Sequence, residues 1–345
     1  MRARRWRVLA GVVAVVAAVG FTAAACGDDD SGSGDTTAAA QSDLEVGLVS
    51  DVGKFNDRSF NQSGLEGLEK AEAELGVEGT PIESASASDY IPNLTTLARG
   101  GADLTIGQGF LMADSMNTVA GQFPDSNFAI VDFSNAALKD KPANVLGLTF
   151  ATNENSYLIG YMAAKVVQEQ GGPQVISAVG GQELPTVTIF LKGYEAGAKA
   201  ANPNIKVLTG YSQEFVAQGP CKEMALDQIS KGSQVVFQVA GGCGLGALSA
   251  AKDEGVWGVG VDRDQSDLGP HILTSAVKRV DTSVFDAVKS VQDGTFKGGE
   301  DATFDLANGG VALGKTSPKV SQQILDEVEG LKQQIIDGEI TPPSQ

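Results

Sequence analysis

Few side chains in this chain could carry catalytic or metal chemistry. The 345 residues include one histidine, His271, and three cysteines: Cys26 near the N-terminus, and Cys221 and Cys243 much later. This leaves very little for zinc ligation or histidine-based catalysis. We therefore expect no metal, no cofactor and no histidine-based catalysis.

Charged side chains at strand ends are better candidates for a functional site. Asp51, Asp114, Asp262 and Lys278 each stand at or just beyond the end of a predicted strand. Carboxylates accept hydrogen bonds and an ammonium group donates them. Ligands of open α/β sheets bind beyond the carboxyl ends of the strands, so we expect a small-molecule site in a cleft at this edge of the sheets.

A glycine-rich segment offers an enzyme interpretation. Gly242, Gly244 and Gly246 follow a predicted strand, open a helix and precede Asp262 by 20 residues, counted from the first glycine. This resembles a dinucleotide-binding fingerprint. The spacing is GxGxG rather than GxGxxG and the unit lies late in the chain, so we rank this interpretation well below binding.

Short apolar strands alternate with amphipathic helices along the chain. The first pair is a buried strand at 45–50 and a helix at 63–75. Leucines at helical spacing predict this helix, and Gly76 predicts its end. Further strands are predicted at 104–106, 128–131, 145–150, 174–179, 205–209, 235–239, 256–261 and 272–278, and further helices at 94–98, 115–123, 156–170, 187–201, 221–231, 245–254, 280–292 and 320–337.

This alternation predicts an α/β fold in two lobes. About 300 ordered residues exceed what one core usually spans, and the two βα series are similar in kind. The segment after the second series would have to cross back between the lobes. The predicted N-terminal lobe is 44–151 plus about 278–298, and the predicted C-terminal lobe is 152–277 plus about 299–340.

The N-terminus predicts export and lipidation. Four arginines precede an apolar run that ends in AAAC, which is typical of a signal peptide at 1–25 followed by acylation of Cys26. Residues 26–43 are acidic and rich in Ser, Gly, Thr and Ala, which predicts a flexible tether. Removing 1–25 deletes four positive and no negative charges, so the formal charge of −18 becomes −22. Such a charge disfavours nucleic acid.

Cys221 and Cys243 are the two cysteines left for the folded part. In an oxidising exterior, two cysteines most simply form one disulfide. The alternative is two separate buried thiols, since the sequence alone does not show whether they are close.

Five motifs in order resemble one family, the basic membrane protein (BMP) lipoproteins, which are purine-nucleoside-binding components of ABC importers. The motifs span nearly the whole mature chain. They are DVGKFNDRSFNQS at 51–63, IGQGFLMAD at 106–114, VFQVAGGCGLG at 236–246, GVDRDQ at 260–265 and TSAVKR at 274–279.

The resemblance implies a type I periplasmic-binding-protein fold, in which two Rossmann-like lobes are joined by three hinge crossings. It also implies a non-enzymatic protein, anchored by lipid at the outer face of the cell membrane, that passes a nucleoside to an ABC permease. Proteins of this kind are usually monomers, and we expect one here. The same fold with a sugar or another small solute, and a surface lipoprotein without a transport role, are the alternatives.

The resemblance also suggests a role for each candidate residue. Phe60 and Phe215 would stack on the two faces of the base, since flat rings favour such contacts. Asp262 and Lys278 would hold the ribose hydroxyls. The remaining expected ligand residues are Asp51, Asn61 and Asp114, of which the last two would contact the edge of the base, and Gly241, which would permit close backbone approach.

Overall fold

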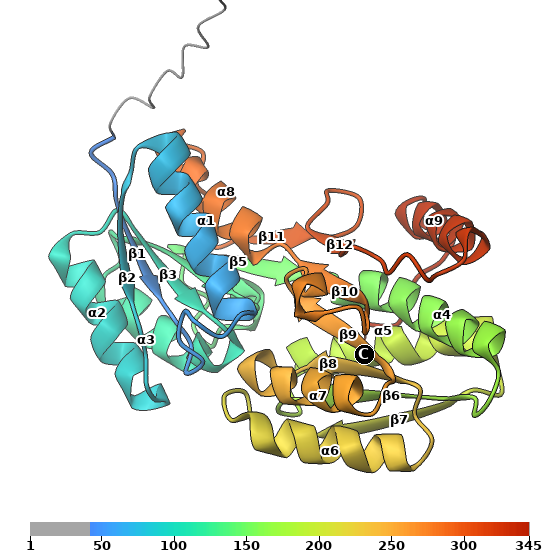
Figure 1. Cartoon of the computed structure of the whole chain (residues 1–345). Helices are drawn as coiled ribbons and strands as arrows, with labels where there is room; N and C mark the ends of the chain where they lie inside the picture. The colour runs from blue at the N-terminus through green and yellow to red at the C-terminus, as the bar shows by residue number, and fades with distance from the viewer. Residues whose placement is uncertain (1–41, 345) are drawn as a thin grey trace, which may run out of the picture. The chain divides into compact units, whose positions relative to one another are not determined.

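The computed structural model describes residues 42–344. These residues form two lobes, each with a six-stranded sheet (Figure 1). The predicted signal peptide, Cys26 and the predicted tether up to residue 41 lie outside the described residues.

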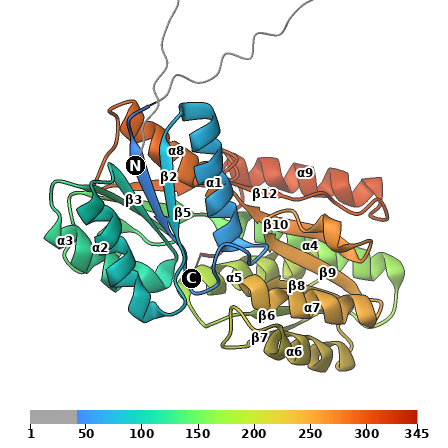
Figure 2. The same cartoon turned by 60° about the vertical axis from the view of Figure 1, so that its left-hand side comes forward.

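The N-terminal lobe contains a parallel sheet with helices on both faces. Helices α1 (Phe60–Leu75) and α8 (Val280–Gln292) pack together on one face (Figure 2), and α2 (Tyr90–Gly100) and α3 (Ala113–Gln122) cover the other. In spatial order the strands are β11 (Asp301–Phe304), β5 (Val145–Phe150), β4 (Asn127–Val131), β3 (Leu104–Gln108), β1 (Glu45–Val49) and β2 (Glu78–Ile82).

The C-terminal lobe repeats this arrangement. Helices α4 (Thr152–Gln170) and α5 (Pro185–Ala201) lie on one face, α6 (Gln218–Ser230) and α7 (Gly241–Asp253) on the other, and α9 (Gln322–Ile336) packs on α4. Only the edge strand β12 pairs antiparallel among the strands of this lobe. The strands in spatial order are β12 (Val311–Leu313), β10 (Ile272–Lys278), β9 (Trp257–Asp262), β8 (Val235–Val239), β6 (Val175–Gly180) and β7 (Lys206–Tyr211).

The chain passes between the lobes three times: after β5, after β10 and between β11 and β12. The predicted boundary at about 298 is wrong, because β11 still pairs with β5 in the N-terminal sheet. The third crossing therefore lies at 305–310. Both strands lie in one stretch rich in Gly and Asp at 294–313, and nothing in its residue pattern shows that they belong to different sheets.

The start of α1 also differs from the prediction. The helix begins at Phe60 rather than at Ser63, so Phe60 and Asn61 lie in its first turn and not in a loop. Gly67 lets α1 approach α8 closely, since a Cβ there would lie 2.3 Å from the carbonyl oxygen of Asp281. This contact holds the middle of α1 against the first turn of α8, which follows the crossing after β10.

Candidate functional site

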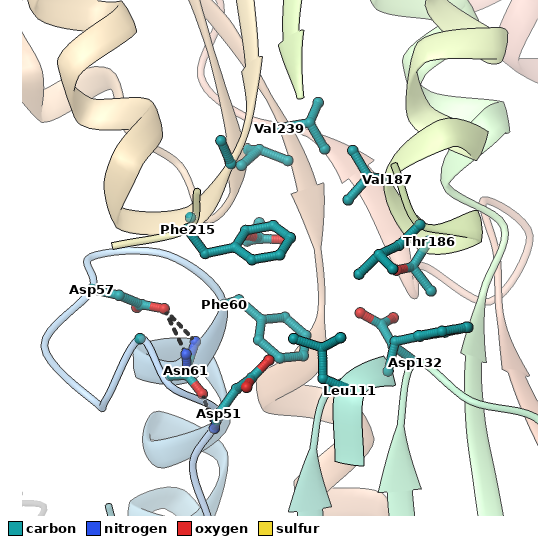
Figure 3. Close-up of a pocket in the computed structure, with 18 of the residues that line it drawn as sticks. Asp51, Asp57, Phe60, Asn61, Leu111, Asp132, Thr186, Val187, Phe215 and Val239 are labelled. Carbon is teal, nitrogen blue, oxygen red and sulfur yellow. Dashed lines mark hydrogen bonds between the residues drawn. The ribbon is translucent and has the colours of Figure 1, made fainter. Parts of the chain in front are cut away.

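A pocket lies between the two lobes, and residues at the carboxyl ends of both sheets line it (Figure 3). Seven of the eight predicted ligand residues are among those that line it. They are Asp51, Phe60, Asn61, Phe215, Gly241, Asp262 and Lys278.

Asp114 is the exception. It is exposed in the first turn of α3 and does not line the pocket. The chain turns through a short 3₁₀ helix at Phe110–Met112 before α3 begins, so Phe110 and Leu111 face the pocket in its place. The structure therefore does not bring Asp114 together with the other seven predicted residues.

Two phenylalanines enter the pocket from opposite lobes. Figure 3 shows the ring of Phe215 on one side of the pocket and the ring of Phe60 on the other. The loop that carries Phe215 is bonded to α7, because the carbonyl of Phe215 accepts a hydrogen bond from the backbone N–H of Cys243 at 3.0 Å. The ring lies against Gly181, where a Cβ would come within 2.2 Å of it. Gly241 opens α7 below this loop with a left-handed φ of 53°.

The disulfide between Cys221 and Cys243 joins α6 to α7, with the two Cα atoms 5.6 Å apart. Cys243 also donates its backbone N–H to Phe215, as described above. The bridge therefore restrains the segment that carries one aromatic wall of the pocket.

Asn61 organises the loop between β1 and α1. Its side-chain oxygen accepts from the backbone N–H of Asp51 at 2.8 Å, and its amide donates to Asp57 at 3.0 Å. Asp57 also accepts three backbone N–H groups at the start of α1. Burial raises the pKa of Asp57 and, despite the hydroxyl of Tyr90 that donates to it, of Asp51.

Asp262 is the most deeply placed carboxylate of the pocket. It is 6% exposed, has a left-handed φ of 63° and accepts a hydrogen bond from the Ser59 hydroxyl of the other lobe at 2.5 Å. Burial raises its pKa to about 6, although nearby Lys278 acts in the opposite direction. This carboxylate therefore gains most from a ligand that donates hydrogen bonds to it.

Lys278 lies at the end of β10 and is buried. Its Nζ donates to Asp132 at 2.5 Å, lies 4.7 Å from the centre of the Phe60 ring and lies 4.9 Å from that of Phe150. Both rings face the ammonium group at distances typical of cation–π contacts. The lysine is thus fixed between two aromatic rings and one carboxylate.

Asp132 is one of the charged pocket residues that were not predicted from the sequence. It follows β4 directly, with a φ of 69°, and lines the pocket. The signal was present, because 128–131 is a predicted strand and Asp132 is the next residue. Asp51 and Asp262 also stand at the ends of predicted strands, so strand ends alone would have pointed to Asp132.

The pocket is acidic overall. Four carboxylates line it, Asp51, Asp57, Asp132 and Asp262, against the single cation Lys278 in the lining described by the structure. A neutral ligand rich in N–H and O–H donors fits this balance, whereas an anion would meet repulsion.

Neither a metal centre nor a membrane span is found within residues 42–344. No three His, Cys, Asp or Glu side chains gather there as a metal site would require. None of the helices in this range is both long and apolar enough to cross a bilayer.

Comparisons with known proteins give a consistent result. The Bmp family model, described as ABC transporter substrate-binding protein PnrA-like, matches residues 44–345. The ABC transporter nucleoside-binding protein BmpA of Lactococcus lactis is 38% identical, and the match covers 98% of this chain and 99% of that protein. Basic membrane protein A of Borreliella burgdorferi is 34% identical over 87% of this chain and 88% of its own length.

A solved structure agrees. A solute-binding protein of an ABC transporter system from Aeropyrum pernix K1 superimposes with a TM-score of 0.79 at 27% identity, covering 88% of this chain and 94% of that one. These matches confirm the family resemblance and the type I periplasmic-binding-protein fold that the sequence predicts.

Proposed function

Because the chain belongs to the Bmp family of PnrA-like ABC transporter substrate-binding proteins, we propose that it captures a purine nucleoside between its lobes and delivers it to a permease. The observation that carries this proposal is the pocket itself, which combines two aromatic side chains from opposite lobes with buried carboxylates and one lysine. The relative from Lactococcus lactis, named as a nucleoside-binding protein, supports the same ligand class.

The base lies between Phe60 and Phe215. Stacking of a base on an aromatic side chain contributes about 1–3 kcal/mol by alanine substitution. Asn61 and Asp51 face the edge of the base, where the Asn61 amide retains one N–H beyond those used to hold the loop. A purine offers both donors and acceptors on that edge.

The ribose lies at Asp262 and Lys278. A carboxylate can accept from both hydroxyls of the diol, and the ammonium group donates to their oxygens. A ligand without the diol leaves the buried carboxylate of Asp262 without its hydroxyl donors, which gives strong discrimination. The acidic lining repels phosphate, so nucleosides bind in preference to nucleotides.

Binding proceeds by hinge closure. Contacts between the lobes, such as Ser59 with Asp262 and Lys278 with Asp132, come together when the cleft closes over the ligand. The ligand stabilises the closed form to the extent that it touches both lobes, and the permease recognises that form.

The N-terminus provides the membrane attachment. Acylation of Cys26 and cleavage before it place the folded lobes, as a monomer, on a tether at the outer face of the membrane. This location brings the binding protein close to its permease.

Isothermal calorimetry of the refolded protein tests the ligand class. Refolding removes any nucleoside that survives purification. We expect tight binding of adenosine, guanosine or inosine, weaker binding of uridine and cytidine, and none of free ribose. Binding of a sugar with no response to any nucleoside would contradict the proposal and favour a sugar-binding member of the same fold.

A further inference from the structure

A second pocket adjoins the first along the interlobe cleft. The two pockets share Phe110, Asp132 and Thr186 in their linings, so they are continuous. The second pocket is bounded by both lobes, through Phe133 and Ile189, and by Phe150 at the end of β5. A free nucleoside held at Phe60, Phe215 and Asp262 does not fill it.

Lys278 marks the junction of the two pockets. Its Nζ lies between the ring of Phe60 in the first pocket and the ring of Phe150 in the second. The carboxylate to which it donates, Asp132, lines both. In Figure 3, Asp132 and Thr186 lie on one side of the phenylalanine rings, and Asp57 and Asn61 lie on the opposite side. With the base edge at Asn61 and the ribose at Lys278, the second pocket begins at the ribose end.

The surface of the second pocket is mainly apolar. Phe110 and Phe133 form a tilted pair with ring centres 4.9 Å apart, and both stay partly exposed, as does Ile189. Its hydroxyls are partly engaged elsewhere: Ser134 donates to Asp301, and Thr149 pairs with Thr303.

The charge of the lining also limits which chemical groups the second pocket can accept. Asp132 is the charged side chain in the second pocket, and within residues 42–344 no lysine, arginine or histidine lines it. Partly exposed aromatic surface in a cleft favours apolar groups, while the carboxylate disfavours an anion.

We propose that this second pocket receives an uncharged, apolar substituent on the 5′ carbon of the ribose. The cleft then accepts nucleosides whose 5′-hydroxyl is replaced by an alkyl thioether, and it rejects 5′-phosphates. The inference rests on the proposed function, since it takes the nucleoside orientation from it.

A series of 5′-substituted adenosines tests the inference by calorimetry on the refolded protein. The probes are adenosine, its 5′-deoxy-5′-methylthio and 5′-deoxy-5′-butylthio derivatives, and adenosine 5′-monophosphate. We expect the butylthio compound to bind more tightly than the methylthio compound, by about fourfold for each methylene that becomes buried. The monophosphate should bind more weakly than adenosine.

Two variants locate the effect. Ala137 is exposed and lines only the second pocket, so Ala137→Trp should abolish the gain of the butylthio over the methylthio compound. Ala136 is its exposed neighbour outside that lining, and Ala136→Trp should preserve the gain.

The outcomes separate the two proposals. If adenosine binds and the butylthio compound binds no better than the methylthio compound, or the gain survives in Ala137→Trp, this inference is overturned alone. The inference is also overturned if N6-benzyladenosine binds more tightly than adenosine while the 5′ thioethers do not, because the base would then face the second pocket. If none of adenosine, guanosine and inosine binds, the proposed function fails, and this inference with it.

Discussion

Asp132 and Asp262 occupy equivalent places in the two lobes. Each lies at the carboxyl end of the third strand in its sheet order, β4 and β9, and each has a left-handed backbone, with φ of 69° and 63°. Aspartate tolerates this conformation better than most residues, and such backbones are common at functional sites. The surroundings differ, however. Asp132 forms an ion pair with Lys278, whereas the direct hydrogen-bond donor to Asp262 is the hydroxyl of Ser59.

The difference shows that equivalent positions in the two lobes can have different electrostatic roles. The charge of Asp132 is balanced within the protein, and Asp132 in turn fixes the lysine. Asp262 is buried with less compensation, which raises its pKa to about 6. The C-terminal lobe therefore holds the carboxylate that depends most on the ligand.

Replacing each aspartate by asparagine tests this comparison most strongly, because asparagine also tolerates a left-handed backbone. Asp262→Asn should lower nucleoside affinity by about a hundredfold or more, since a charged acceptor for the diol is lost. Asp132→Asn should cost about tenfold, through a less well positioned Lys278. Calorimetry at pH 7.5 gives both values. Equal losses, or unchanged affinity of Asp262→Asn, would refute the assignment of the ribose to Asp262.

The same substitution should act in the opposite direction on stability. The folded-state pKa of Asp262 lies above its ordinary value of 3.8, so protonation of this carboxyl group favours the folded state. The resulting contribution to stability is fully present below about pH 4 and is lost as the pH rises through 6. Without ligand at pH 7, Asp262→Asn should therefore raise the free energy of unfolding of the closed form, in which Asp262 is buried, by an amount on the order of 2–3 kcal/mol. The advantage should shrink toward pH 4. Urea unfolding at both pH values measures it, and a destabilised variant at pH 7 would contradict the raised pKa.

The two aromatic walls extend the comparison of the lobes. Phe60 starts a helix and contacts Lys278, while Phe215 lies on a loop next to exposed Val216. Phe60→Ala and Phe215→Ala should each weaken binding by about 1–3 kcal/mol. The loss should be larger for Phe60, because its ring also holds the lysine in place. Val216→Ala is a matched control that should keep wild-type affinity in the same titration. A greater loss at Phe215 would reverse the ranking of the walls.

The sequence predicted the regular parts of the fold well, because strands buried on both faces give unbroken apolar runs. The strand β2 was not predicted, because its residues EGTPI form an exposed edge with a proline and contain no unbroken apolar run. Most of the site was also predictable, through the motif that contains Phe60 and through strand-end charges. Asp114 lies outside the pocket lining because sequence spacing does not show which way a side chain points after the turn at Phe110–Met112.

A surface ion pair between the lobes should give the smallest effect. Arg263, which follows β9, donates to Glu66 of α1 at 2.6 Å, and the two side chains are 30% and 38% exposed. Water and salt screen such a pair, and exposed pairs typically contribute about 0.2–1 kcal/mol. Glu66→Ala and Arg263→Ala should therefore each reduce nucleoside affinity only a few fold.

A double-mutant cycle on this pair separates surface contacts from buried ones as the cause of closure. The coupling energy between Glu66 and Arg263, measured by calorimetry, should stay below about 1 kcal/mol and fall with added salt. Lys289 and Asp293 form a similarly exposed pair within α8 alone, so Lys289→Ala should leave affinity unchanged. A coupling energy above about 2 kcal/mol would mean that a rim contact, rather than Asp262 and the ligand, holds the lobes together.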